Sequence, residues 1–139
     1  LALAEFADAF YRQPSRKLRL LGVTGTNGKT TTTHLVEQIL GKAGKKAGLI
    51  GTLGSRIYGQ DAYFEAKHTT PQAPELQALL AGMLENGCSH VAMEVSSHAL
   101  ALKRVAGAQF AVACLSNISQ DHLDFHKTMD NYWKAKRIL

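Results

Sequence analysis

A short glycine-bearing run near the start of the chain combines residue types that bind phosphate. Residues 25–30 are Gly-Thr-Asn-Gly-Lys-Thr, between a β-favouring run and a helical pattern. Glycines let successive backbone N–H groups turn inward, and a helix N-terminus adds its dipole. Lys29 would place a charge on β- and γ-phosphates, and Thr30 can hold Mg²⁺. We predict a phosphate loop made by Gly25, Thr26, Asn27, Gly28, Lys29, Thr30 and Thr31.

The predicted loop departs from the common phosphate-loop pattern at one position. That pattern has a glycine five residues before Gly28, where this chain has Val23. The alternative is an ordinary strand–turn–helix glycine turn with an incidental lysine. We favour the phosphate loop because its Gly-Lys-Thr lies between strand and helix, where phosphate binding requires it.

Glu94 ends another apolar run and can supply a carboxylate to a metal ion. It follows Val91-Ala92-Met93, a context in which an unsupported buried charge would be costly. With Thr30 it would complete a Mg²⁺ site that bridges phosphates, since Mg²⁺ prefers oxygen ligands. The alternative is a strand-end glutamate that faces water.

Two histidines further along the chain are spaced like zinc ligands. His122 and His126 are four residues apart, which suits two ligands on one helical face. Zinc is nevertheless the weaker interpretation, because no third ligand has a familiar spacing and Cys88 and Cys114 lie in apolar runs. The role of His126 stays open. Other single histidines are predicted to be structural: His34, His90 and His98.

Strand and helix patterns alternate around these residues. The β-favouring runs are 18–23, 47–51, 90–95 and 110–115, and the helical patterns are 1–11, 30–40, 74–85 and a last helix capped by Thr128. Residues 52–67 fit a small hairpin or extended loop. The alternation predicts an α/β fold, a mostly parallel sheet with helices on both faces. Ligands collect at the carboxyl ends of such strands, so three polar segments are expected to form one site: the turn after Val23, residues 94–98 and residues 117–121.

Bulk properties fit one folded domain. The chain has 139 residues, 45% hydrophobic and 19% charged, and no apolar run approaches the roughly 18 residues that span a membrane. Both cysteines have apolar neighbours, which predicts buried thiols in a reducing cytoplasm. The net charge of +5 could indicate nucleic acid, a membrane surface or small anions. We favour surface lysines and a few phosphate contacts, with no nucleic-acid or membrane partner.

Four strings of the sequence together resemble the Mur ligase family. They are residues 25–30, His68-Thr69-Thr70-Pro71, residues 93–98 and residues 117–126, in fitting order and spacing over about residues 10–139. The nearest likeness is to members that add the third amino acid to UDP-N-acetylmuramoyl-L-Ala-D-Glu. The resemblance implies an ATP-dependent ligase of peptidoglycan precursor synthesis that uses ATP and Mg²⁺ and forms an amide through an acyl phosphate.

The resemblance also implies roles for single residues. His122 would hold or adjoin a second Mg²⁺, and Lys136, carbamylated by CO₂, would act as a carboxylate ligand of that metal. Without the resemblance, residues 134–137 would pass as a solvated face, and Lys134 is the alternative position for the modified lysine. Related enzymes often have a glutamine at Leu102, which puts one substrate hydrogen bond in question. The implied substrate residues are His68, Thr69, Thr70, Ser96 and Arg104.

The same resemblance suggests how the chain is divided. Residues 1–17 would be a linker and helix from a missing N-terminal domain, and 18–139 the N-terminal part of the central ATP-binding domain of a monomer. The third amino acid is expected to be diaminopimelate, alternatively lysine. Rival interpretations are a cyanophycin- or folylpolyglutamate-type ligase and a non-catalytic nucleotide-binding module. The module would not need Thr69, Arg104 or Lys136.

Overall fold

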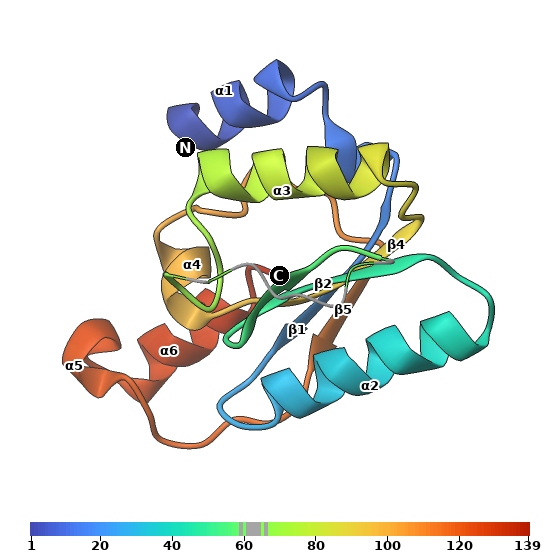
Figure 1. Cartoon of the computed structure of the whole chain (residues 1–139). Helices are drawn as coiled ribbons and strands as arrows, with labels where there is room; N and C mark the ends of the chain where they lie inside the picture. Colours follow the sequence, from blue (N-terminus) through green and yellow to red (C-terminus); the bar gives the residue numbers. More distant parts are fainter. Residues whose placement is uncertain (59, 61–64, 66) are drawn as a thin grey trace.

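The computed structural model describes residues 1–58, 60, 65 and 67–139, which form a five-stranded sheet with helices on both faces (Figure 1). The strand order is β3-β2-β4-β1-β5. Only β3 is antiparallel to its neighbour, β2. The prediction of a mostly parallel sheet is confirmed. The strands are β1 (Arg19–Thr24), β2 (Ala47–Gly51), β3 (Gly54–Arg56), β4 (His90–Glu94) and β5 (Val112–Leu115).

The helices are α1 (Ala2–Phe10), α2 (Lys29–Lys42), α3 (Ala73–Glu85), α4 (Ser97–Ala101), α5 (Leu123–His126) and α6 (Met129–Lys136). α2 covers one face of the sheet, while α3 covers the other with α1 packed on it (Figure 1). Pro74 lies in the first turn of α3, and the Thr128 side chain accepts from Asn131 N to cap α6, as predicted. Among the described residues, no helix is both long enough and apolar enough to cross a membrane.

The main core lies between α3 and the sheet. Leu76, Leu80 and Met83 are fully buried, because their spacing of four and three residues keeps them on one side of α3. Gly48 of β2 makes room for this helix: a Cβ there would come within 2.7 Å of Met83 Sδ. These three side chains pack with apolar residues of β1, β2 and β4.

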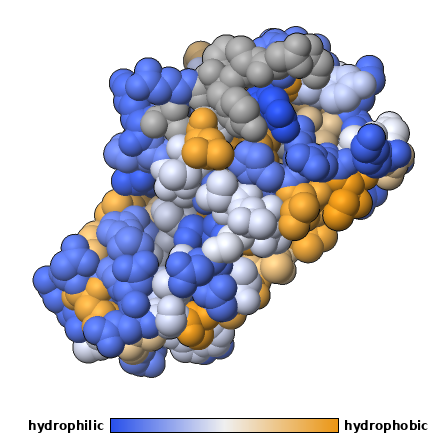
Figure 2. All heavy atoms as spheres, turned by 60° about the horizontal axis from the view of Figure 1, so that its bottom comes forward, coloured by the Kyte–Doolittle hydropathy of each residue, from blue (hydrophilic) through white to orange (hydrophobic). Residues whose placement is uncertain are grey.

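The side of α2 that packs on the sheet is less apolar than the sequence pattern suggested. Residues 35, 36, 39 and 40 fall on one stripe, yet Leu35 and Ile39 are 54% and 64% exposed. The stripe that faces the sheet instead runs through buried Thr33 and half-buried Val36 and Leu40. The surface on this side of the molecule accordingly shows separate hydrophobic patches between hydrophilic side chains (Figure 2).

Two other expectations need correction. Cys88 is buried, but Cys114 is exposed, because β5 is an edge strand and all four of its residues are exposed. The hairpin or extended loop predicted within residues 52–67 is also placed differently: a hairpin joins β2 to β3 and turns at residues 52–53, so its first strand precedes the predicted range. The rest of that prediction, around Gly59 and residues 61–64, lies outside the described residues.

Candidate functional site

The predicted phosphate loop connects β1 to α2. Gly25 and Gly28 have positive φ angles of +145° and +84°, which side-chain-bearing residues rarely adopt. Gly28 faces open space, so its backbone is accessible to a ligand. Val23 is buried within β1, two residues before the turn begins. The glycine of the common pattern is therefore unnecessary here, because this turn is built from Gly25 onward.

The segment after β5 holds the loop in shape. Asn27 N donates to Asn117 Oδ1 at 3.0 Å, and Asn117 Nδ2 donates to Asn27 O at 2.8 Å. Ser119 N donates to Thr26 Oγ1 at 2.9 Å. The N–H groups that open α2 have no intrahelical acceptors and are available to an anion.

Replacing Gly25 with alanine is expected to abolish nucleotide binding and lower thermal stability. A Cβ there would collide with Ser116 Oγ and come within 3.0 Å of Asn117 O, and the φ of +145° would be strained for alanine. Equilibrium binding of ATP and the melting temperature measure the two effects. Normal ATP binding by Gly25→Ala would show that the loop tolerates a side chain. Gly41→Ala is the matched control and should change neither quantity, because a Cβ at Gly41 of α2 would meet open space.

Glu94 lies directly behind the loop. Its carboxylate is 1% exposed and accepts from Thr30 Oγ1 at 3.0 Å, so the alternative of a glutamate facing water is wrong. β4 lies beside β1 with Val23 opposite Glu94. This pairing places Glu94 next to the loop that follows β1, and so next to Thr30. No described cation forms a salt bridge with this carboxylate. A buried carboxylate and a threonine hydroxyl without a cation are an oxygen-donor set that suits Mg²⁺.

Two lysines converge on the backbone of the loop. Lys29 Nζ donates to Gly25 O at 2.9 Å and to Thr26 O at 3.0 Å. Lys136 Nζ donates to Gly25 O at 2.8 Å and is 4% exposed. Burial, reinforced by the nearby Lys29 charge, lowers the pKa of Lys136 from 10.5 to about 8. Lys134 instead pairs with Asp130 on the surface, so a solvated face describes Lys134 but not Lys136.

A cavity of about 270 Å³ unites residues from the carboxyl ends of β1 and β4 with α4 and α6. It is rich in cationic side chains, as a site for phosphates and acidic peptides requires. Two of the three predicted polar segments line this cavity, whereas residues 117–121 contact the phosphate loop without lining it. The lining residues are Gly25, Lys29, His68, Thr69, Ser96, Ser97, His98, Arg104, His122 and Lys136.

Not every predicted substrate residue faces this cavity. Thr70 is fully buried, and its hydroxyl donates to Glu94 O at 2.9 Å and accepts from Ser96 N at 3.0 Å. Arg104 donates to Thr70 O at 3.2 Å. Thr70 therefore joins the cavity wall to β4. Leu102, the position at which related enzymes often have a glutamine, follows α4 and is 52% exposed.

The histidines form an aromatic cluster beside the cavity. The His98 ring lies 4.9 Å from that of His122 and 4.2 Å from that of Phe125, and His126 Nε2 is 2.9 Å from Ser97 Oγ. Burial is the main cause that lowers the pKa of both His98 and His126. Within the described part of the chain, no three His, Cys, Asp or Glu side chains are grouped to hold a metal, which leaves zinc without support.

Two features of the site were missed from the sequence. His98 was assigned no role in the site, yet it forms part of the cavity wall. Thr52 follows β2 and donates to Glu94 twice, although residues after that strand were not included among the polar segments. The available signal was the one used for the other strands, namely a polar residue at the carboxyl end of a parallel strand.

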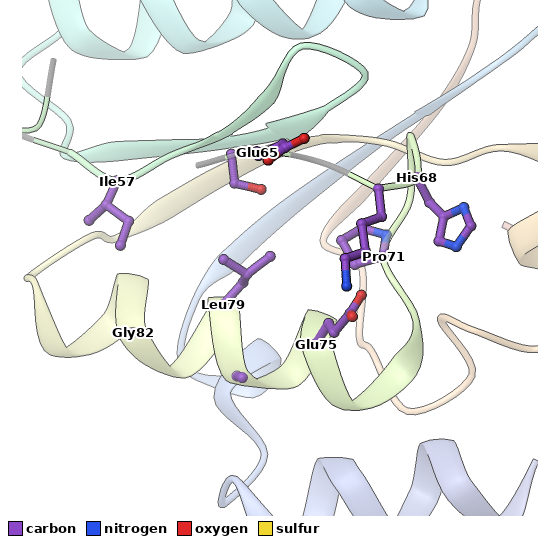
Figure 3. Close-up of a pocket in the computed structure, with 10 residues that line it drawn as sticks. Ile57, Glu65, His68, Pro71, Glu75, Leu79 and Gly82 are labelled. Carbon is purple, nitrogen blue, oxygen red and sulfur yellow. The ribbon is translucent and has the colours of Figure 1, made fainter. Parts of the chain in front are cut away.

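A larger cavity of about 410 Å³ adjoins the site between β3 and α3 (Figure 3). It shares His68 with the first cavity, while Ile57 and Leu79 make part of its wall apolar. It contains no residue of the phosphate loop. We place the chemistry in the smaller cavity, where the loop, half-buried Lys29 and buried Lys136 converge.

A family model described as the Mur ligase middle domain matches residues 23–139. The chain belongs to the Mur ligase family. Among curated relatives, the "UDP-N-acetylmuramoyl-L-alanyl-D-glutamate--2,6-diaminopimelate ligase" of Corynebacterium glutamicum is 56% identical over 137 residues, and that of Gloeobacter violaceus is 58% identical over 136. The matches cover 99% and 98% of this chain.

A solved structure of a ligase with the same name has a TM-score of 0.84 and 31% sequence identity, and the match covers 99% of this chain. The chain spans only 26% and 27% of the two curated Mur ligases and 28% of the solved one. It thus matches about a quarter of each relative's length. The match includes the loop, Glu94 and the cavity described above.

Proposed function

We propose that this chain is the ATP-binding part of a ligase that adds diaminopimelate to UDP-N-acetylmuramoyl-L-Ala-D-Glu. The observation that supports this most is the convergence of the phosphate loop, Lys136 and Arg104 on one cavity. The relatives named for this reaction favour diaminopimelate over lysine as the third residue. We assign residues 1–17 to a linker and helix, and residues 18–139 to the N-terminal part of the central domain.

In the proposed reaction the γ-phosphate of ATP passes to the terminal carboxylate of the muramoyl-dipeptide. The amine of the amino acid then attacks the acyl phosphate, an amide forms and phosphate leaves. Lys29 and the N–H groups that open α2 would offset the charge on the transferred phosphoryl group. Mg²⁺, held by Thr30 and Glu94, would supply further charge neutralisation at the phosphates.

The remaining side chains of the cavity suit binding and positioning. Thr69, Ser96 and His68 offer hydrogen bonds, and the Arg104 guanidinium suits the carboxylates of an acidic peptide. Ser96 shows no features of a nucleophile, because its hydroxyl caps α4 by accepting from Ala99 N at 3.2 Å. We therefore assign the substrate-facing side chains to positioning rather than covalent catalysis.

Ligation by the full-length protein tests the proposal. Labelled UDP-N-acetylmuramoyl-L-Ala-D-Glu should give a tripeptide product when ATP, Mg²⁺ and diaminopimelate are all present. The 139-residue chain alone should give none, because the site is expected to need a further domain that holds the amino acid. Product from the short chain would contradict that expectation. A full-length protein that binds ATP but not the muramoyl-dipeptide would support a nucleotide-binding module instead.

A further inference from the structure

Among the described residues, the turn after β2 supplies two of the three hydrogen bonds to the Glu94 carboxylate. Thr52 N donates to Oε1 at 2.9 Å, and Thr52 Oγ1 donates to Oε2 at 3.1 Å. The third donor is Thr30 Oγ1, at 3.0 Å from Oε1. Thr52 thus donates to both oxygens of the carboxylate, and Thr30 of the phosphate loop donates to Oε1 as well. This arrangement fixes the direction in which the buried carboxylate points.

Gly51, immediately before Thr52, is shaped to accept this carboxylate. A Cβ at Gly51 would collide with Glu94 Oε1 and come within 3.0 Å of Cδ and 3.1 Å of Cγ. Its φ is not positive, so the requirement for glycine here is steric rather than conformational. The Gly51-Thr52 pair therefore provides both the space for the carboxylate and the donors that orient it.

The Thr52 hydroxyl also reaches the wall of the cavity. Its oxygen lies 3.1 Å from Thr69 Oγ1. A hydroxyl has one hydrogen, and the charged carboxylate is the stronger acceptor for that of Thr52. The Thr52 hydroxyl is placed to donate either to Thr69 Oγ1 or to Glu94 Oε2, so it links the cavity wall to the carboxylate. The chain of contacts runs from Thr69 through Thr52 to Glu94.

We propose that Thr52 is a positioning residue that aims the Glu94 carboxylate at the metal beside the phosphate loop and couples it to Thr69. The proposal rests on the proposed function, because the metal is that of Mg·ATP and Thr69 faces the muramoyl-dipeptide. Partners that orient a metal-binding carboxylate typically change metal affinity by 10- to 100-fold when they are removed. Loss of the hydroxyl should therefore raise the Mg²⁺ requirement more than it affects ATP binding without metal.

Thr52→Val in the full-length protein tests this, because valine keeps the shape and the backbone N–H but removes the hydroxyl. Calorimetric titration of ATP at varied Mg²⁺ is expected to show a roughly tenfold higher Mg²⁺ concentration for half-maximal tight binding. ATP binding in EDTA should be unchanged. Thr52→Ser should restore most of the Mg²⁺ response. Leu53→Ala is the matched control. Leu53 lies in the same turn and is 64% exposed, so this variant should keep the Mg²⁺ dependence of the wild type.

A melting temperature for each variant without ligand separates misfolding from misplacement of the carboxylate. Wild-type Mg²⁺ dependence in a folded Thr52→Val, or a Thr52→Ser as impaired as valine, would overturn the proposal. These titrations need no muramoyl-dipeptide. Absence of ligation by a wild-type protein that binds Mg·ATP would defeat the proposed function while the Thr52 result still stood. A wild-type protein unable to bind Mg·ATP would overturn both.

Discussion

Lys29→Ala is expected to lower ATP turnover by the full-length protein by at least roughly 10²- to 10³-fold, the usual cost of one transition-state donor. Within the described part of the chain, the hydrogen bonds of the Lys29 ammonium go to the carbonyl groups of Gly25 and Thr26, in the loop itself. With ATP bound, the same atom would lie among the β- and γ-phosphates, where charge develops in the transfer. Steady-state phosphate release measures the effect.

The fold should survive this substitution. Lys29 is half-buried at the start of α2 and is not one of the residues that form the hydrophobic core, so the melting temperature should stay near that of the wild type. Lys42→Ala, an exposed lysine in the last turn of the same helix, is the matched control and should leave turnover unchanged. Turnover by a folded Lys29→Ala within a few-fold of wild type would defeat the assignment of the phosphate loop.

The loop could be predicted because its chemistry and its conformation are both local. Gly25 and Gly28 adopt positive φ angles that glycine takes far more readily than other residues, and Lys29 follows in the adjoining helix. The convergence of separate polar segments also followed from the sequence, since parallel strands present their carboxyl ends at one edge. Asn117, far along the chain, binds Asn27 by that rule.

Contacts that depend on strand order could not be predicted in the same way. The place of Thr52 at the carboxyl end of β2 was predictable, but its contact with Glu94 requires β2 to lie next to β4, and nothing in either segment specifies that neighbour. Burial posed a similar limit. The spacing of apolar residues in α2 identified a helix. Which side of that helix faces the sheet depends on how the helix is placed in the fold, and Ile39 lies on the exposed side. Cys114 is exposed because β5 is an edge strand.

Lys136 provides the second prediction with a large expected effect. We expect it to be carbamylated in the active, full-length enzyme. The ammonium is buried against Gly25 O and stands near Lys29, so it adds positive charge to a site that would already hold metal ions. Carbamylation would replace this cation with an anion that could bind the expected second Mg²⁺ beside His122. Lys136→Ala should therefore lose most ligase activity.

The pH dependence of the modification has a definite sign. CO₂ reacts with the neutral amine, and the pKa of Lys136 is lowered to about 8. At pH 7 roughly one amine in ten is neutral, against fewer than about one in a thousand for an ordinary lysine. Carbamate formation from added ¹³C-bicarbonate should increase as the pH rises from 7 to 9, and a ¹³C carbamate signal that Lys136→Ala lacks would report it directly.

Chemical rescue and a neighbouring lysine separate a carbamate from a simple structural lysine. A small carboxylic acid should restore part of the activity of Lys136→Ala, because it can fill the gap and supply the missing carboxylate. Lys134→Ala is the matched control and should change little, since Lys134 is exposed and paired with Asp130. Loss of activity in Lys134→Ala with near-normal Lys136→Ala would place the modified lysine two residues earlier. If neither substitution reduced activity, a carbamylated lysine would not be needed for ligation, and the role expected for Lys136 would be wrong.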